Sequence, residues 1–389
     1  MKILHLALQA PYNEGWGYQE NLLTKHQAKM GHDVILVTTC KKNTETNGVQ
    51  TCELEDYISP DGFRVVRLSS KKGVFKRVYT ILNIYDIYDL LKELSPDFVM
   101  VHGLGSFSAL QVKKYVKKCN QRCVVIADTH IDENNSSVLR KSGVKSSVYL
   151  CLLRWLNARM RKCYKKVYGV SPRRTEIAET VFRFPADMLG TLPAGADDDK
   201  ICFSQKTSVR RDIREKHGIS DDDFLIVTGG KIDEKKNIDS LMKAISNINR
   251  KNVKLLVFGN CSNTIKETIE NLAKHESMRY IGWISSDEVY NYYLAADLVV
   301  FPGLHSVLWE QACAAKVPCL FNRLKGFTHF DVGGNCQFME EVSPQGLKLA
   351  VEKLIFTDEY YKMKAVAESE LTDVFLYSNI AQKALEAYE

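Results

Sequence analysis

Two glycines and two lysines follow a short apolar segment in the middle of the chain. Residues 224–228 are predicted to form a strand, and they lead into Gly229, Gly230 and Lys231, with Lys236 five residues later. Glycines that leave a strand let backbone N–H groups approach an anion closely. Two ammonium groups at such a turn can neutralise a diphosphate. The alternative is a surface turn with two solvated lysines.

A glutamate farther along the chain lies in an apolar setting. Residues 301–320 are predicted to be a strand end, a loop, a short helix and the next strand, with Glu310 in the helix. A carboxylate there is costly unless it is hydrogen-bonded, and a ribose diol offers two donors; the alternative is a glutamate that faces water. Ser306 precedes the helix, whose N-terminus is a natural anion site. Gly259 ends a neighbouring predicted strand at the same sheet edge as Gly230.

A glycine-containing loop follows the first predicted strand, residues 3–8. It contains Gly15 and Gly17 together with a group of polar and aromatic side chains, which are Glu14, Trp16, Tyr18, Gln19 and Glu20. Such side chains are suited to hydroxyl recognition and to stacking on a sugar ring. The alternative is a plain turn between a strand and a helix.

Histidines end two other predicted strands of the first half. His130 follows the strand at 124–128, and His102 ends the neighbouring strand. Ligands of doubly wound folds bind at the carboxyl ends of the strands, so we favour a role for His130 at the site, with His102 as the weaker candidate. Asp128 and Asp132 are candidates for acid–base groups, or for caps of the helix that follows.

Strands that alternate with helices must position these residues. Strands are predicted at 3–8, 34–38, 63–68, 98–102, 124–128 and 167–170, and again at 224–228, 255–258, 278–281, 298–301 and 317–321. Helical spacing appears at 18–30, 78–94, 107–118, 238–248 and 380–388. This alternation predicts an α/β fold, with parallel sheets covered by helices.

The polar stretch 197–223 separates the two series and indicates a domain junction. We expect two Rossmann-like, doubly wound domains that face each other across a cleft. The first, 1–197, is expected to bind the acceptor, and the second, 198–375, a nucleotide-sugar. Residues 376–389 are expected to form a helix that crosses back to the first domain.

The composition is that of a globular protein. The chain has 389 residues, 45% apolar and 26% charged, with a net charge of +6. This length fits two domains, and no apolar run is long enough to span a membrane. The apolar start is short and interrupted by His5, so it is interpreted as a buried strand and not a signal peptide. The 11 scattered cysteines favour reduced thiols in a cytosol-like compartment.

Basic residues are concentrated in one stretch. Residues 140–183 contain twelve Lys or Arg and two Glu, and within 148–168 they alternate with apolar residues. Residues 71–77 form a second basic cluster. One interpretation is docking on an anionic membrane surface; another is a packed helix with a solvated basic face. Nucleic acid is disfavoured because the net charge is small and no nucleic-acid motif appears.

The motifs of the second half, taken in order, resemble the C-terminal half of family 4 retaining glycosyltransferases, which have the GT-B fold and belong to the glycosyl transferases group 1. The resemblance rests on Gly230-Lys231, Lys236, Gly259, residues 280–284, Tyr292, residues 295–298, Pro302, residues 310–314 and Val317-Pro318. In the first half, residues 31–34 and 193–197 resemble two turns of the same family.

The resemblance implies roles for these residues. It implies that Lys231 and Lys236 bind the donor diphosphate, and that Glu310 holds the ribose. It implies that Gly15 and Gly17 let their loop approach the donor phosphate.

The resemblance also places His130 beside the donor sugar at the reaction centre. The family normally has a further glutamate eight positions before Glu310, where this chain has Pro302. In the family, this further glutamate helps to hold the donor sugar. In this chain, His305 or Ser306 is expected to fill part of that role.

The sequence therefore predicts a retaining glycosyltransferase that moves a sugar, with a UDP-sugar preferred as donor, to a glycan or lipid-linked acceptor in cell-surface polysaccharide synthesis. Lys231, Lys236 and His130 are the expected catalytic residues. No cofactor and no metal are expected, since no Asp-x-Asp motif appears that would suggest a metal-dependent sugar-nucleotide site. A cytoplasmic location is expected, with an anionic membrane surface as one partner. The alternatives are a sugar-nucleotide epimerase and a silent nucleotide-sugar-binding subunit.

Overall fold

The computed structural model describes residues 1–44, 48–70, 74–133, 135–140 and 143–388. The chain divides into two compact units. Unit 1 comprises Met1–Pro193 and Ile380–Glu389, and unit 2 comprises Ala194–Asn379. The division therefore falls at Pro193 and Asn379, where the sequence suggested 197 and 375.

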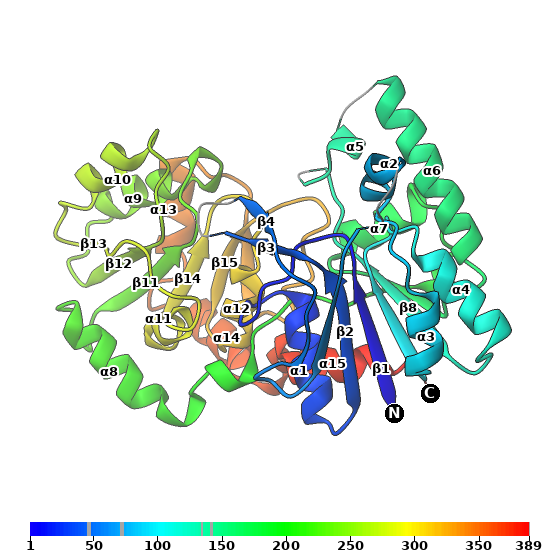
Figure 1. Cartoon of the computed structure of the whole chain (residues 1–389). Coiled ribbons are helices and arrows are strands. Elements are labelled where there is room, and N and C mark those ends of the chain that lie inside the picture. The colour runs from blue at the N-terminus through cyan, green and yellow to red at the C-terminus, as the bar shows by residue number, and fades with distance from the viewer. Residues whose placement is uncertain (45–47, 71–73, 134, 141–142, 389) are drawn as a thin grey trace. The chain divides into compact units, whose positions relative to one another are not determined.

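Unit 1 is built on an eight-stranded sheet in the order β10-β9-β8-β7-β1-β2-β6-β5 (Figure 1). Its strands are β1 Lys2–Ala7, β2 Asp33–Thr39, β5 Asp56–Ile58, β6 Arg64–Leu68, β7 Phe98–His102, β8 Val124–Thr129, β9 Lys166–Gly169 and β10 Leu189–Thr191. All neighbours are parallel except β5, which pairs antiparallel with β6. A separate hairpin joins β3 Lys41–Asn43 to β4 Val49–Thr51.

Helices cover both faces of this sheet. They are α1 Gln19–Lys29, α2 Lys76–Ile81, α3 Tyr88–Leu94, α4 Ala109–Lys118, α5 Ser137–Arg140, α6 Val144–Met160 and α7 Pro172–Thr180. Successive strand residues point to opposite faces. Leu4 and Leu6 of β1 thus join the core under α3, α4 and α6, while His5 between them contacts α1.

One predicted helix of unit 1 is wrong. The spacing at 78–94 predicted a single helix, but the structure has two, α2 and α3. Asn83 adopts a left-handed φ of 49° between them, a conformation that ends a helix. The apolar residues of the two short helices happen to keep a helical spacing across the break.

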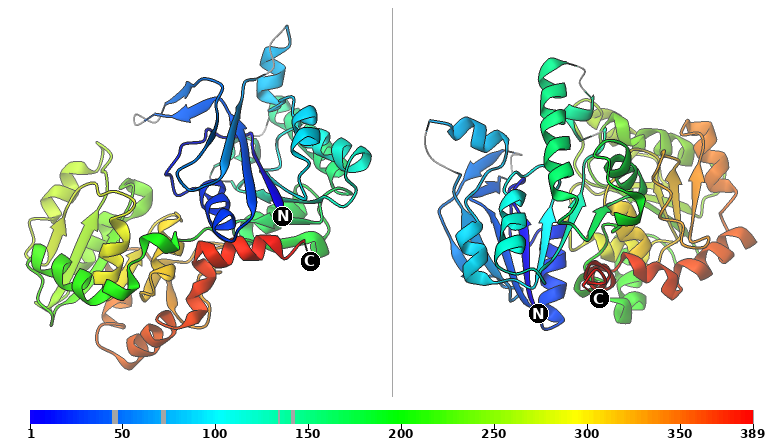
Figure 2. Two further views of the ribbon diagram at one scale, coloured as in Figure 1. Left: turned by 60° about the horizontal axis from the view of Figure 1, so that its bottom comes forward. Right: turned by 90° about the vertical axis from the view of Figure 1, so that its right-hand side faces the viewer.

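The last helix, α15 Tyr377–Leu385, leads the chain back to unit 1. Gln27 Nε2 of α1 donates to the Ala381 carbonyl at 3.5 Å, and the Tyr388 ring lies 6.4 Å from that of Phe98. Both chain ends therefore lie at one end of the unit 1 sheet, as Figure 2 shows.

Unit 2 has a six-stranded parallel sheet in the order β13-β12-β11-β14-β15-β16. The strands are β11 Phe224–Gly229, β12 Val253–Phe258, β13 Met278–Tyr280, β14 Leu298–Phe301, β15 Cys319–Asn322 and β16 Cys336–Met339. The helices are α8 Lys206–Lys216, α9 Ile238–Ser246, α10 Lys266–Leu272, α11 Val289–Ala295, α12 Leu308–Ala314, α13 Pro344–Glu352 and α14 Asp358–Ala367. Alternate residues of β11 join two separate apolar cores, so the sheet is doubly wound.

All 11 cysteines lie among the described residues as free thiols. Within the same residues, no helix combines the length and the apolar character needed to cross a bilayer.

Candidate active site

Two glycine turns lie against each other at the carboxyl edge of the unit 2 sheet. β11 and β12 are parallel neighbours, with Gly229 opposite Phe258. Gly230 and Gly259 follow these strands with φ of 106° and 119°, in the region that favours glycine. A Cβ on Gly259 would lie 1.8 Å from the Gly230 carbonyl oxygen, so no larger residue fits. Because neither glycine has a side chain, the two turns present backbone groups beside Lys231.

Lys231 and Lys236 follow this edge of the sheet and differ in their exposure and in their partners. The Lys231 side chain is 78% exposed, and its Nζ is 3.9 Å from an Asp233 carboxylate oxygen. Lys236 is half-buried and donates from Nζ to the Leu304 carbonyl at 2.6 Å. Burial lowers the Lys236 pKa, and the nearby positive charge of Lys231 lowers it further. The two ammonium groups therefore act on the same small region, and Lys236 ties it to the loop before α12.

Glu310 is fully buried, as the apolar residues around it in the sequence indicated. Its hydrogen-bond partners in the structure are side chains of the protein itself. Both carboxylate oxygens lie 3.0 Å from His305 Nε2, and Oε1 lies 3.5 Å from His329 Nε2. Burial alone would raise the Glu310 pKa, but the charges and hydrogen bonds of His305 and His329 together outweigh it and lower the pKa to about 2. The carboxylate is therefore ionised and held by imidazoles.

The loop before α12 surrounds this carboxylate. The N-cap of α12 is Val307, which gives no side-chain cap, and the preceding Ser306 accepts a hydrogen bond at its carbonyl from Trp309 N–H. The His305 ring packs against Phe327, with centroids 4.8 Å apart. Gly303 fits against the Lys236 backbone, because a Cβ there would lie 2.3 Å from Lys236 Cα. Lys236, His305, Ser306 and Glu310 are thus brought together in unit 2.

The glycine loop of unit 1 ends at α1. Gly15 has a φ of 72°, and no atom lies within 4 Å of a Cβ built on Gly15 or Gly17. Trp16 and Tyr18 pack edge to face with centroids 5.3 Å apart, and both are partly exposed. The loop therefore needs Gly15 for its backbone conformation, while Gly17 leaves open space.

A chain of buried hydrogen bonds runs beneath the unit 1 strand ends. Gln27 Oε1 and His5 Nε2 are 2.7 Å apart, His5 Nδ1 and His102 Nε2 are 2.9 Å apart, and His102 Nδ1 and Asp128 Oδ2 are 2.7 Å apart. His130 lies at the exposed end, with Nε2 3.7 Å from Asp128 Oδ1.

The partners of this chain fix its polarity. Gln27 uses its amide nitrogen on Ala381, so its oxygen accepts from His5 Nε2. Burial and the neighbouring His102 charge lower the His5 pKa to about 3, so neutral His5 accepts from His102 at Nδ1. Because His102 also donates to Asp128, it carries protons on both nitrogens. Burial alone would lower the His102 pKa, but the Asp128 carboxylate raises it, in agreement with a buried ion pair.

This arrangement gives the unit 1 candidates different roles. Asp128 is fully buried; burial alone would raise its pKa, but the charges of His102 and His130 lower it. His102 uses both nitrogens inside the protein, whereas His130 remains accessible for a ligand. Asp132 pairs with Arg174 at 2.8 Å, so its contacts are structural. His130 therefore keeps the catalytic candidacy, with Asp128 and His102 as its support.

A pocket of about 350 Å³ lies at these strand ends, entirely within unit 1. Its lining includes His102, Gly103 and His130 from the strand ends, and Tyr18, Gln19 and Glu20 from the start of α1. Tyr18, Gln19 and Glu20 thus face one space with the strand-end histidines, which the sequence proposed separately, whereas Gly15 and Gly17 are not part of its lining.

Sequence reasoning missed His5, Gln27 and His329. His5 was interpreted only as an interruption of an apolar run, although an inward-facing histidine in a buried strand requires a polar partner. That partner, His102, is 97 residues away in the sequence. His329 gave no signal, because it lies outside every motif considered.

Known proteins resemble this chain in sequence. Residues 209–366 match the sequence model of a family described as "Glycosyl transferases group 1". The protein described as uncharacterized glycosyltransferase MJ1607 of Methanocaldococcus jannaschii is 23% identical over 241 residues, 58% of this chain and 60% of that protein. Lipopolysaccharide 1,2-N-acetylglucosaminetransferase of Salmonella typhimurium is 23% identical over 218 residues, 52% of this chain and 56% of that protein. The chain thus matches less than two thirds of the length of these relatives.

Solved structures resemble the whole chain. A glycosyltransferase from Rickettsia africae superposes with a TM-score of 0.69 at 16% identity, over 100% of this chain and 97% of that one. HepE from Anabaena in complex with UDP gives 0.66 at 15% identity, over 99% of each chain. The fold is the α/β fold of GT-B proteins, with two Rossmann-like units.

Proposed function

We propose that this protein, whose residues 209–366 belong to the glycosyl transferases group 1, transfers a sugar from a nucleotide-sugar to a glycan or lipid-linked acceptor. The observation that carries the proposal is the pair Lys231 and Lys236 beside the two glycine turns of unit 2. This edge offers backbone and positive charge to a diphosphate, and Glu310 lies in the same unit for the ribose.

The proposed chemistry needs the departing diphosphate to be stabilised as negative charge develops. Lys231 and Lys236 supply fixed positive charge for this step, which lets transfer proceed without a metal or another cofactor. His130 hydrogen-bonds a sugar hydroxyl and orients the anomeric carbon for attack. We propose retention of the anomeric configuration, in keeping with the resemblance of the motifs.

The relatives support finer proposals about the substrates. The Anabaena structure holds UDP, which favours a UDP-sugar as donor. The Salmonella relative is named for transfer in lipopolysaccharide, which favours an acceptor of cell-surface polysaccharide synthesis. We also propose a cytoplasmic location, where nucleotide-sugars are at hand.

Incubation with a panel of UDP-, GDP- and ADP-sugars, with and without acceptor glycans, tests this function. We expect release of nucleoside diphosphate that depends on acceptor, survives a chelator and yields a product with the donor's anomeric configuration by NMR. Conversion of the donor sugar without acceptor would instead identify an epimerase. Binding without turnover in every combination would identify a silent subunit.

Glu310→Gln tests the ribose site. An amide accepts through only one atom, so we expect nucleoside diphosphate affinity to fall by about tenfold, equivalent to about 1.4 kcal/mol, by calorimetry. Inorganic pyrophosphate is the control ligand, because it lacks the ribose and should bind both proteins equally. Full nucleotide affinity in the variant would make Glu310 a structural partner of His305 and His329 only.

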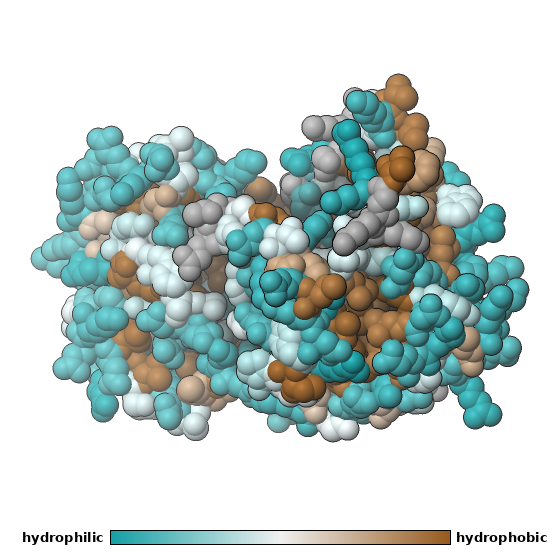
Figure 3. Space-filling model, in the orientation of Figure 1, coloured by the Kyte–Doolittle hydropathy of each residue, from teal (hydrophilic) through white to brown (hydrophobic). Residues whose placement is uncertain are grey.

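We further propose a membrane-facing surface on α2 and α6. Buried Leu153, Leu156 and Met160 pack α6 onto unit 1, in agreement with the packed-helix interpretation. The opposite side of α6 is apolar and exposed nevertheless, with Val144, Val148, Leu152 and Trp155 at helical spacing. Figure 3 shows apolar side chains gathered at the upper end of this helix.

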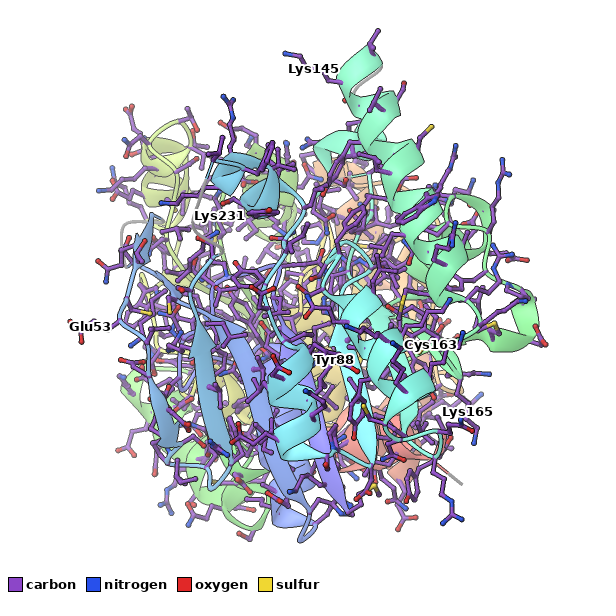
Figure 4. The ribbon with its side chains drawn as sticks, turned by 45° about the vertical axis from the view of Figure 1, so that its right-hand side comes forward. Glu53, Tyr88, Lys145, Cys163, Lys165 and Lys231 are labelled. Atoms are coloured by element: carbon purple, nitrogen blue, oxygen red, sulfur yellow. The ribbon has the colours of Figure 1, made fainter. Side chains whose placement is uncertain are left out.

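Helix α2 extends the same surface. Tyr149 of α6 donates to the Ile81 carbonyl at 3.4 Å, so the helices are neighbours. Phe75, Val78 and Ile81 are exposed there, next to the exposed cations Lys76 and Arg77. Lys145 projects into solvent from the first turn of α6 (Figure 4). Lys71, Lys72, Gly73 and Lys141 of the predicted basic clusters lie outside the described residues.

Exposed apolar groups among cations are suited to an anionic bilayer surface. We expect co-sedimentation with anionic vesicles but not with neutral ones, weakened by salt. Val148→Ser with Leu152→Ser should reduce it about tenfold, whereas Leu349→Ser at an exposed position of unit 2 should not. Equal binding to neutral and anionic vesicles, or no binding, would leave only the packed-helix interpretation.

A further inference from the structure

A buried glutamine in the unit 1 pocket has no partner for its amide. Gln19 is 3% exposed, and neither Nε2 nor Oε1 has a hydrogen-bond partner in the described part of the chain. Burying an unsatisfied amide destabilises a protein, so such groups need an explanation. Gln19 lines the 350 Å³ pocket, where a ligand can supply the missing partners.

The pocket selects the chemistry of that ligand. Neither lysine nor arginine appears in its described lining, both nitrogens of His102 are engaged by His5 and Asp128, and Glu20 contributes an acidic group, so the lining does not favour a phosphate or carboxylate. The space lies within the range of small-molecule sites. Gln19 offers both a donor and an acceptor, as adjacent hydroxyls of a sugar ring require. His130 adds a polar group, and Tyr18 adds an aromatic ring on which a sugar can pack.

Hydrogen bonds and close packing join the residues at the strand-end side of the pocket. Gln9 Nε2 donates to the His102 carbonyl at 3.0 Å, and its amide fills the space that a side chain at Gly103 or Gly105 would occupy. Asp128 accepts from the Gly103 N–H at 2.9 Å. A pocket with hydrogen-bonded strand ends on one side and an unsatisfied amide on another is suited to a ligand of matching shape.

We propose that this pocket binds a neutral hexopyranose ring, and that Gln19 is the residue that recognises its hydroxyl groups. The inference rests on the proposed function, since the sugar is that of the donor or of the acceptor. It names a recognition residue whose failure does not affect the nucleotide contacts of unit 2.

Replacement of Gln19 by leucine separates binding from folding. Leucine removes the buried unsatisfied atoms, so the melting temperature should stay unchanged or rise. Saturation-transfer NMR on the full chain measures the binding of a panel of free hexoses and N-acetylhexosamines. We expect the affinity of Gln19→Leu for these sugars to be at least tenfold lower than that of wild type. Gln19→Met, which keeps the unbranched shape, should give the same result, and Gln50→Leu at an exposed position of β4 should bind as wild type does.

The outcomes distinguish the pocket from the nucleotide site. Nucleoside diphosphate affinity of Gln19→Leu should equal that of wild type; if wild type itself binds no nucleotide, the proposed function fails while the sugar result still stands. In transfer assays, a rise in KM for the donor assigns the ring to the donor, and a rise for the acceptor assigns it to the acceptor. Sugar binding that is unchanged in both Gln19 variants, or absent in wild type, would overturn the proposal.

Discussion

Replacing Lys231 and Lys236 together by alanine should lower kcat/KM for the nucleotide-sugar by about 10²- to 10⁴-fold. Each lysine is expected to give one charge-assisted hydrogen bond to the diphosphate, worth about 1.5–3 kcal/mol. The sum of about 3–6 kcal/mol corresponds to that range of rates. Steady-state kinetics with the preferred donor measures the effect.

The single variants separate binding from structure. Lys231 is exposed, so its loss should leave the melting temperature unchanged. Lys236 also holds the Leu304 carbonyl, so its loss should lower the melting temperature as well. Lys251→Ala with Lys266→Ala, at exposed positions of the same unit, is the matched control. A double variant at positions 231 and 236 with the kinetics of this control would remove the diphosphate site from β11.

Replacing His130 by alanine should lower turnover by about 10²- to 10⁴-fold, the range for a positioned polar catalytic group. Its imidazole is 46% exposed at the pocket while Asp128 orients it from below. Nucleoside diphosphate affinity should stay unchanged, because that ligand has no sugar. Turnover and calorimetry on the same preparation give the comparison.

The control for this variant is His32→Ala, another histidine of unit 1 that lies outside the pocket lining. If His130→Ala folds normally and transfers sugar at the wild-type rate, the reaction centre does not lie at the end of β8. His102 is then the next position to test, although both of its nitrogens are already engaged within the protein.

The sequence was sufficient to predict the central strands of both sheets. Apolar runs such as 98–102 and 224–228 become parallel core strands, because a strand covered on both faces must be apolar throughout. The short strands β5, β10 and β16 were not predicted. All three are short strands at the edges of their sheets, and a polar residue or a glycine interrupts each, so none of them shows a continuous apolar run.

Of the candidate site, the residues at turns after strands could be predicted, but the partners of its buried polar groups could not. Glycines after strands and lysines at turns carry a local signal, so spacing was enough to place Gly230, Gly259 and the two lysines at the carboxyl edge of the unit 2 sheet. The partners of buried polar groups carry no such signal, since they depend on which strands become neighbours. Glu310 was expected to hold a ribose, but its pairing with His329 could not be inferred from any spacing.

A crystal structure of the protein with UDP tests whether the carboxyl edge of the unit 2 sheet holds the nucleotide. We expect a diphosphate within hydrogen-bond distance of Lys231 Nζ, Lys236 Nζ and the backbone after β11, with the ribose hydroxyls on Glu310. A nucleotide bound elsewhere, or a Glu310 that keeps only His305 and His329 as partners while the ribose lies apart from it, would contradict this assignment.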